Sequence, residues 1–319
     1  MLWVRAQRYF MRIAVVTTSY PSFDGDPSGH FVETEVRELE RLGHRVEVLR
    51  PPAGGAFGWP GAPSRLRAHP TRLFEAGTWL TTASRALGRG RVDRVIAHWS
   101  VPSAYPIVTG PFGRDASPEA ELEVVSHGGD IRLLCGLPDG LRSRIVRRVA
   151  ARAARWRFVS DDLRAALGGV VSAADERALG AISVVVPGAL EVPDVSNVRA
   201  DATEKRLALG ERRLYVCAGR LVPAKRVDKV IDYVATSSAI RDRKGRVLVV
   251  LGDGPEREQL EKQARAWQMD VRFLGTTTRR EALGWIGAAD ELVHASRAEG
   301  LSTVVREAGI LGTPVTLLA

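Results

Sequence analysis

The sequence predicts an α/β protein with two doubly wound domains, each built on a parallel sheet, and three observations support this fold class. The chain has 319 residues, about twice the roughly 150 residues of a typical domain. Short apolar runs rich in β-branched residues alternate with segments of helical periodicity, which is the pattern of βαβ units. The alternation stops at a polar stretch, 191–213, and then starts again.

The first domain is expected over residues 1–190. Its strand-like runs are 12–18, 45–50, 94–98, 122–126, 157–160 and 182–186, and helical patterns fall between several of them. The stretch 191–213 contains Pro193, Asp194 and Asn197 and has no sustained apolar period. It is therefore predicted to be the linker between the domains.

The second domain is expected over residues 214–319. Its strand-like runs are 214–219, 247–252, 271–274, 291–294 and 314–318, with helical patterns at about 225–238, 255–267, 279–288 and 302–311. In a doubly wound sheet the ligand-binding loops follow the carboxyl ends of the strands. We therefore expect both domains to present these loops to a shared cleft, and functional residues to lie directly after the strands.

The composition excludes several classes of protein. With 45% hydrophobic and 26% charged residues, the chain is not collagen-like, a coiled coil or a long disordered segment. Cys135 and Cys217 form no CxxC motif, which favours a reducing compartment, so we predict a cytoplasmic protein without a disulfide framework. No apolar run approaches the roughly 18 residues of a membrane span, so neither a transmembrane helix nor a signal peptide is predicted.

The net charge of +9 is concentrated partly in the Arg-rich segment 141–158. Leu141, Ile145, Val149 and Ala153 recur at helical spacing among its cations, so peripheral contact with the anionic inner face of the membrane is one interpretation. An ordinary solvated helix is the other. The charge accompanies no recognised nucleic-acid-binding motif, so we predict no nucleic-acid partner.

Two groups of residues follow strands of the first domain. Gly29 opens a helix after the first strand, where backbone N–H groups suit a phosphate, although an ordinary turn glycine is equally consistent. Asp24 and Asp26 have the D-x-D form of a metal site, but their position favours a turn. After the strand 122–126, a neutral His127 is able to bind a hydroxyl or a phosphate oxygen, or to be a structural histidine. Asp130 would orient a substrate hydroxyl or cap the following turn.

In the second domain, Arg220 and Lys225 lie between a strand and the following helix. Cations at a helix start are unfavourable for the helix dipole unless an anion binds there. They therefore indicate a diphosphate site, with a solvated basic turn as the alternative. Gly252 and Gly254 form a tight turn after the next strand, and Leu274 precedes another glycine turn.

The last cluster surrounds a predicted helix start. Gly300, Leu301 and Ser302 should place backbone N–H groups beside Glu299. Glu307 follows Glu299 by eight residues, about 12 Å if the whole span were helical. Glu307 shares the inward face of that helix, where a carboxylate needs partners. Ribose hydroxyls would supply them, and a salt bridge at the helix edge is the alternative.

Together these motifs resemble those of the retaining glycosyltransferases of family 4, which have the GT-B fold of two Rossmann-like domains. The resemblance extends from Met11 to the end of the chain. It depends on the order and spacing of Gly29, His127-Gly-Gly-Asp130, Gly219-Arg220-Leu221 with Lys225, Gly252-Asp253-Gly254, Phe273-Leu274-Gly275, and the pair Glu299 and Glu307.

The resemblance implies transfer of a hexose from a nucleotide-diphosphate sugar to a lipid-linked or glycan acceptor, with the anomeric configuration kept. It implies that the departing phosphate helps to deprotonate the acceptor, so no cofactor, metal or separate base is expected. His127 and Glu299 are the implied catalytic residues, because they would line the donor sugar. The implied substrate-binding residues are Gly29, Asp130, Arg220, Lys225, Gly252, Gly254, Leu274, Gly300, Leu301, Ser302 and Glu307.

The chain departs from the family pattern at its end. Family members usually continue beyond a segment such as Gly312-Thr313-Pro314 with further elements, whereas this sequence stops at Ala319. The expectation is therefore a shortened second domain. The alternative function that follows is a nucleotide-sugar-binding protein with impaired catalysis, and a GT-B epimerase is a further alternative.

Overall fold

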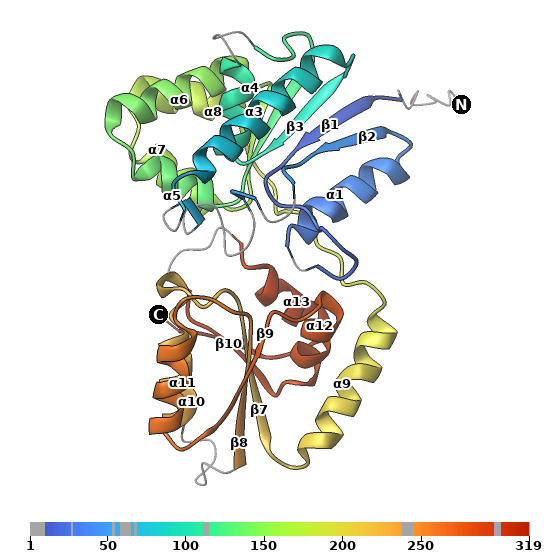
Figure 1. The fold of residues 1–319 in the computed structure, drawn as a ribbon, viewed down its shortest axis with the longest axis vertical. Helices are drawn as coiled ribbons and strands as arrows, with labels where there is room; N and C mark the ends of the chain where they lie inside the picture. Colours follow the sequence, from blue (N-terminus) through green and yellow to red (C-terminus); the bar gives the residue numbers. More distant parts are fainter. Residues whose placement is uncertain are drawn as a thin grey trace, which may run out of the picture. The chain divides into compact units, whose positions relative to one another are not determined.

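A computed structural model describes residues 10–26, 28–52, 55–57, 65–66, 69–110, 115–237, 245–296 and 301–318. The chain divides into two compact units, which Figure 1 shows as two α/β bodies. Unit one comprises residues 1–20 and 28–189, and unit two comprises residues 21–27 and 190–319. Within the described ranges, no helix is both long and apolar enough to cross a membrane.

Unit one contains a parallel sheet of strand order β2-β1-β3-β4-β5-β6. The chain order reverses at β1, which pairs with β2 on one side and β3 on the other. Such a reversal is the point where doubly wound sheets bind ligands. The strands are β1 (Arg12–Val16), β2 (Arg45–Leu49), β3 (Arg94–His98), β4 (Glu121–Ser126), β5 (Arg155–Phe158) and β6 (Ser183–Val185).

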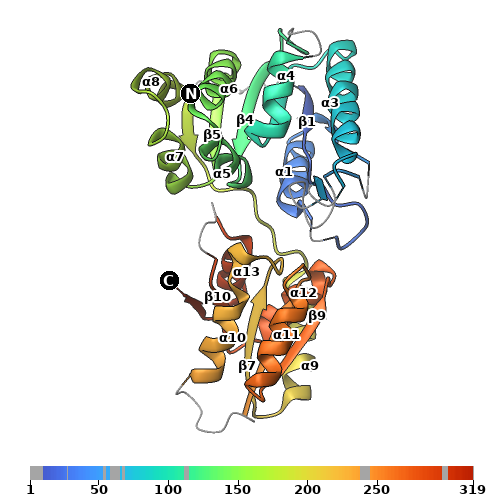
Figure 2. The ribbon, with the colours of Figure 1, turned by 60° about the vertical axis from the view of Figure 1, so that its left-hand side comes forward.

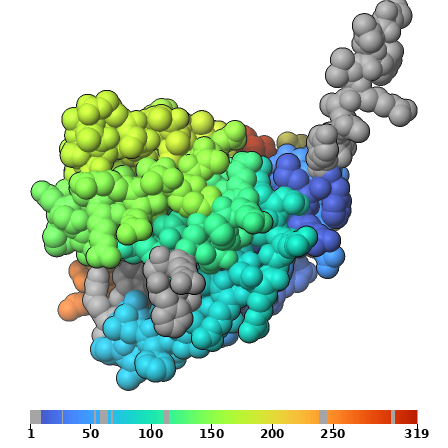
Figure 3. All heavy atoms as spheres, turned by 90° about the horizontal axis from the view of Figure 1, so that it is seen from above, coloured from blue at the N-terminus to red at the C-terminus, as the bar shows by residue number. Residues whose placement is uncertain are grey.

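The central strands of this sheet are buried along nearly their whole length, because helices cover the sheet. β1, β3 and β4 read as continuous buried runs, as expected when both faces of a parallel sheet are covered. Helices α6 and α8 pack against each other, and Figure 3 shows them on the surface in green to yellow-green. The helices are α1 (His30–Arg41), α3 (Arg72–Arg89), α4 (Tyr105–Thr109), α5 (Gly129–Cys135), α6 (Asp139–Arg152), α7 (Asp161–Gly168) and α8 (Ala173–Ile182), with a wide turn, η1 (Ser100–Ala104), after β3.

Unit two contains a second parallel sheet, of order β11-β10-β7-β8-β9, in which the chain order reverses between β7 and β10. Its strands are β7 (Arg213–Ala218), β8 (Arg246–Leu251), β9 (Asp270–Gly275), β10 (Glu291–His294) and β11 (Val315–Leu317). The helices are α9 (Val195–Leu209), α10 (Val227–Thr236), α11 (Arg257–Ala266), α12 (Arg279–Ala288) and α13 (Thr303–Leu311), with a 3₁₀ turn, η3 (Pro223–Lys225), before α10.

Alternate residues of β7 face opposite cores. Leu214 and Val216 pack with residues of α9, α12 and α13, whereas Tyr215 and Cys217 pack with α10 and α11. Figure 2 shows these two groups of helices around the strands. Successive side chains of a strand point to opposite faces, so the one buried strand packs against helices on both sides. Unit two therefore has three layers.

The predicted α/β fold with two doubly wound domains is confirmed, and the predicted strands agree with the observed ones within about two residues, the usual uncertainty of element ends. The stretch 191–213 is a correction, because it contains the 15-residue helix α9. That helix buries only Val198, Ala202 and Leu209, too sparse a set to give a helical pattern. The Asp194 carboxylate caps its start, accepting from the Asn197 backbone N–H at 3.3 Å.

Candidate functional site

Three loops at the carboxyl ends of β7, β8 and β9 are held together by backbone hydrogen bonds. Gly219 N–H donates to the Leu251 carbonyl at 2.9 Å, and Gly252 N–H donates to the Gly275 carbonyl at 2.8 Å. Leu221 N–H donates to the carbonyl of Asp253, also at 2.9 Å. Backbone hydrogen bonds therefore join the three loops into one unit at the carboxyl edge of the sheet.

Gly252 is required by this close approach. Its φ is +125°, and a Cβ at this position would overlap the Gly219 carbonyl oxygen. In the same turn, Gly254 N–H donates to the Asp253 carboxylate at 2.8 Å, and its carbonyl accepts from Arg257 N–H. The predicted tight turn is thus present, and the close packing of the loops explains why it contains glycine. Direct contact of these glycines with a substrate stays a prediction.

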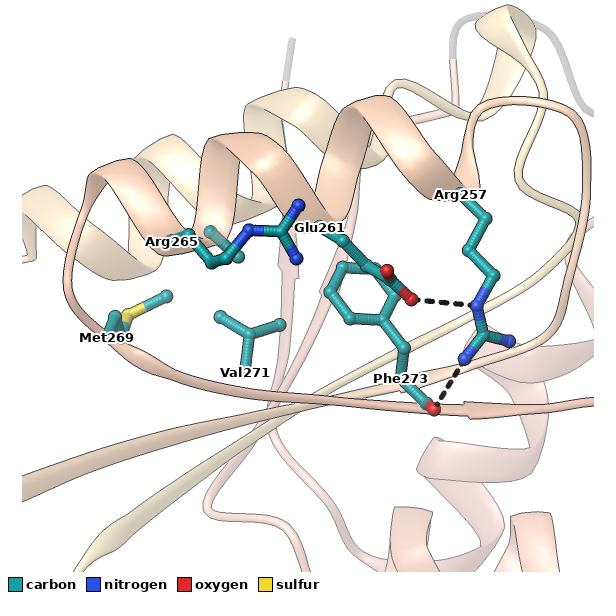
Figure 4. Close-up of a pocket in the computed structure, with 7 residues that line it drawn as sticks. Arg257, Glu261, Arg265, Met269, Val271 and Phe273 are labelled. Atoms are coloured by element: carbon teal, nitrogen blue, oxygen red, sulfur yellow. Dashed lines mark hydrogen bonds and ion pairs between the residues drawn. The ribbon is translucent and has the colours of Figure 1, made fainter.

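Arg257 braces this edge from α11, as Figure 4 shows. Its guanidinium donates to the Phe273 carbonyl at 3.1 Å and to the Glu261 carboxylate at 2.8 Å, and it lies 3.6 Å from the Asp253 carboxylate. The adjoining pocket of about 270 Å³ is lined only by residues of α11, β9 and the segment between them. This pocket is therefore separate from the strand ends where the chain order reverses.

Lys225 lies at that reversal point. Its side chain passes over Gly219, 3.6 Å from where a Cβ would be. Burial, and then the charge of Lys225, lowers the pKa of His294 to about 4. Burial raises the pKa of Cys217 to about 12 despite the same ammonium group. The Lys225 ammonium group therefore lies near the carboxyl ends of β7 and β10. Arg220 is half-buried on the same loop.

Glu307 is buried in α13, with 6% of its surface exposed. Its Oε1 lies 2.7 Å from Nη1 of Arg279, at the start of α12. Burial raises the pKa of Glu307, and the Arg279 guanidinium opposes this shift. The sequence left open whether this carboxylate binds ribose or forms a salt bridge, and the structure gives it an ionic partner.

The remaining predicted residues of unit two are only partly described. Glu299 and Gly300 lie outside the described residues. Leu301 and Ser302 are half-buried, and Ser302 is the N-cap of α13. Leu274 packs against the core formed with α9, α12 and α13, so its side chain also has a structural role.

In unit one, Gly29 is the N-cap of α1 and has a φ of +68°. A Cβ there would overlap the Ser19 carbonyl oxygen, so the loop after β1 requires glycine at this position. The D-x-D segment, which belongs to unit two, is a turn, as the sequence favoured. Its Asp26 carboxylate accepts from Ser22 N–H at 2.9 Å, and the described part of the chain contains no group of three His, Cys, Asp or Glu residues arranged for a metal ion.

His127 is half-buried at the end of β4, beside aromatic rings. Its ring centroid lies 4.7 Å from that of Phe31 and 5.1 Å from that of Trp99. Its Nε2 is 2.9 Å from Nδ1 of His98, the last residue of β3. Burial lowers the pKa of both histidines, that of His98 to about 3, so both are neutral at physiological pH.

Asp130 is 2% exposed and accepts four internal hydrogen bonds. Its Oδ2 accepts from the Ser100 backbone and hydroxyl, each at 2.9 Å, and from the Ser126 hydroxyl at 2.6 Å. Its Oδ1 accepts from Gly128 N–H at 3.2 Å. All of these donors precede Asp130 in the chain, so its carboxylate joins the loop after β3 to the end of β4, while the N-cap of α5 is Gly128. The contact of Asp130 with a substrate stays a prediction.

The Arg-rich segment 141–158 forms the greater part of α6 and all of β5. Its predicted apolar stripe is not a membrane-facing surface, because Ile145, Val149 and Ala153 are buried in the core of unit one. Only Leu141 of that set is exposed. Several of the arginines pair internally, including Arg147 with Asp175 at 2.7 Å. The helical spacing therefore reflects ordinary packing.

Sequence reasoning missed Arg279, although a signal was present. Arg279 and Arg280 open α12, where cations oppose the helix dipole, the same conflict that identified Lys225. Arg280 is exposed and pairs with Asp201. Arg279 is half-buried and pairs with Glu307, and its guanidinium also donates to the Glu191 carbonyl.

Solved structures define the class to which this architecture belongs. HepE of Anabaena in complex with UDP-glucose has a TM-score of 0.62 and 19% identity, covering 96% of this chain and 80% of that chain. The catalytic domain of starch synthase IV of Arabidopsis thaliana has a TM-score of 0.63 and 16% identity, covering 97% and 82%. These likenesses establish the GT-B fold.

A match to a known family lies within unit two. Residues 199–317 match the family described as glycosyl transferases group 1. A GDP-mannose-dependent alpha-(1-6)-phosphatidylinositol monomannoside mannosyltransferase of Mycobacterium tuberculosis is 26% identical over 328 residues, covering 95% of this chain and 79% of the relative. The resemblance seen in the sequence motifs is confirmed at the level of this glycosyltransferase family.

Proposed function

We propose that the protein is a retaining glycosyltransferase that moves a hexose from a nucleotide-diphosphate sugar to a lipid-linked or glycan acceptor. The observation that carries the proposal is the position of Lys225. This cation lies where the chain order of the unit-two sheet reverses, inside the segment that matches the glycosyl transferases group 1 family. An anion bound there would remove the conflict between the cation and the start of α10.

In unit two, different residues would bind different parts of the donor. Arg220 would bind the diphosphate through paired hydrogen bonds, and Lys225 would act as a point charge. Glu307 would accept from ribose hydroxyls while Arg279 keeps it ionised. Glu299 and the segment from Gly300 to Ser302 would contact the donor sugar, as the family resemblance implies.

The family resemblance also implies roles for residues of unit one. Gly29 would approach the phosphates through the start of α1. His127, neutral in this environment, would bind a sugar hydroxyl. The departing phosphate would take the acceptor proton on the face that it leaves, so the configuration at the anomeric carbon is kept without a separate base.

The donor and acceptor classes to test first come from relatives. The Mycobacterium tuberculosis relative is named as GDP-mannose-dependent and as acting on a phosphatidylinositol monomannoside. GDP-mannose and a lipid-linked glycan are therefore the first substrates to test here. Arg144, Arg148 and Arg155 are exposed on α6 and β5, and these cations would support peripheral contact of a cytoplasmic enzyme with an anionic membrane surface.

The test is calorimetric binding of GDP, UDP, ADP and their sugars to the wild-type protein and to Arg220→Ala and Glu307→Ala. Arg265→Ala and Glu258→Ala are matched controls, because these side chains are exposed on α11. One nucleotide should bind, and its affinity should be lost in the first two variants but kept in the controls. Absence of binding by folded wild-type protein would overturn the proposal.

The donor selected in this way then enters a transfer assay with lipid-linked acceptors. NMR of the product should show the same anomeric configuration as the donor. Inversion would refute the retaining mechanism but not the donor site. Binding without transfer to any acceptor would favour the alternative function, a nucleotide-sugar-binding protein with impaired catalysis.

A further inference from the structure

A buried polar pair joins the ends of β3 and β4. His98 has no exposed surface, so it cannot contact a substrate. Its Nδ1 lies 2.9 Å from Nε2 of the half-buried His127, and the planes of the two rings are 14° apart with their centroids 5.2 Å apart. One of the two nitrogens must carry the proton, because a hydrogen bond needs one donor and one acceptor.

The surroundings of Nε2 of His98 decide which of the two hydrogen-bonded nitrogens carries the proton. Within the described residues, its Nε2 has no hydrogen-bond partner, but it lies 3.9 Å from the Oε2 of Glu35 on α1. Glu35 is held by Arg157 of β5, whose Nε also lies 3.2 Å from Glu123 of β4. A carboxylate near Nε2 stabilises an N–H at that atom and repels a lone pair.

The protonation of the pair follows from this charge arrangement. With the proton of His98 on Nε2, its Nδ1 carries a lone pair and must accept. His127 then donates from Nε2, which leaves a lone pair on its Nδ1. The opposite arrangement would place a lone pair of His98 toward the Glu35 carboxylate, which repels it, whereas an N–H at the same atom is attracted to the carboxylate.

We propose that His98 is a positioning residue that fixes His127 in the Nε2–H tautomer, so that His127 presents Nδ1 as a hydrogen-bond acceptor. In the context of the proposed glycosyltransferase, on which this last step rests, His127 accepts from a sugar hydroxyl rather than donating to an oxyanion. Phe31 and Trp99 lie against the same ring, so its orientation is fixed as well as its tautomer.

Imidazole nitrogen spectra test the tautomer without any substrate. The chain has six histidines, and long-range ¹H–¹⁵N correlation spectra distinguish protonated from unprotonated ring nitrogens in each. His127→Gln and His98→Asn spectra assign the signals. Wild-type His127 should show a protonated Nε2 and an unprotonated Nδ1 at neutral pH. A protonated Nδ1 would overturn the proposal.

Two substitutions of His98 separate positioning from packing. His98→Phe keeps a ring but removes the acceptor, so His127 should lose its single tautomer. His98→Asn places a side-chain amide near the former Nδ1, and its oxygen can accept, so the tautomer should persist. Folding of both variants is checked by thermal unfolding. An unchanged His127 tautomer in folded His98→Phe protein would refute the role.

Kinetics then connect the tautomer to the reaction. In His98→Phe, kcat should fall by about 100-fold, the scale of a misplaced catalytic contact, while the affinity for the free nucleotide diphosphate stays unchanged. His98→Asn should restore most of kcat. An unchanged kcat in His98→Phe would refute the effect on transfer. Were the wild-type protein to lack transferase activity, the proposed function would fail, and the spectra would still decide the tautomer.

Discussion

Arg279 and Glu307 form a buried ion pair across the first turn of α12 and the middle of α13, with 2.7 Å between Nη1 and Oε1. A carboxylate at this depth would be protonated more readily without a cation, and burial does raise its pKa. The pair and the ribose contact are compatible interpretations, because a carboxylate has acceptor sites on two oxygens. Arg279 would therefore keep Glu307 ionised for the proposed contact with ribose hydroxyls.

Replacing Arg279 should weaken nucleotide binding without any contact between Arg279 and the nucleotide. In Arg279→Met, the pKa of Glu307 rises further because the opposing charge is lost. The affinity for the nucleotide diphosphate should fall by about ten-fold, and more at pH 6 than at pH 8. Calorimetry at the two pH values measures both effects.

Arg280→Met is the matched control, because Arg280 is the next residue of the same helix and pairs with Asp201 at an exposed site. Its nucleotide affinity should equal that of the wild type at both pH values. Equal affinities of Arg279→Met and Arg280→Met would show that Glu307 does not depend on the buried pair.

Lys225 should control the titration of His294. Burial, and then Lys225, holds the pKa of His294 at about 4. In Lys225→Met the repulsive charge is gone, so this pKa should rise, while burial keeps it below the ordinary value near 6.5. NMR titration of the His294 ring protons measures it, with the exposed Lys229→Met as the control. An unchanged pKa in Lys225→Met would show that the ammonium group lies elsewhere in solution.

The features that the sequence predicted correctly are those that leave a local pattern in it. Buried parallel strands such as Ile13–Val16 give unbroken apolar runs, and glycines such as Gly29 and Gly252 are fixed by backbone approaches that exclude a Cβ. The parts that it missed depend on three-dimensional partners. The partner of Arg279 lies 28 residues further along the chain, and α9 buries too few side chains to give a helical period.

Asp130 should behave as a structural residue. In Asp130→Asn, an amide NH₂ group replaces one of the oxygens that now accept from Ser100, Ser126 and Gly128. The lost acceptor should reduce the free energy of unfolding by about 2–4 kcal/mol, as measured by urea denaturation. Asp162→Asn, exposed in the first turn of α7, should change it by no more than about 0.5 kcal/mol. Equal stability of the two variants would refute this structural role.

The neutral histidine pair should make the protein less stable in acid. Burial lowers the pKa of His98 from near 6.5 to about 3, so between these values the unfolded chain binds a proton that the folded protein does not. The stability contributed by neutral His98 is therefore complete above pH 6.5 and is lost as the pH falls toward 3. The slope from this one residue reaches about 1.4 kcal/mol per pH unit.

The amide of His98→Asn does not titrate, so the free energy of unfolding should fall less steeply with acid in this variant than in the wild type. Urea denaturation at pH 7.5, 6.5, 5.5 and 4.5 measures both curves. The difference between them isolates His98, because every other titrating group is common to both proteins. Parallel curves over this range would mean that His98 accepts a proton in the folded state, and with it that the buried pair is not neutral.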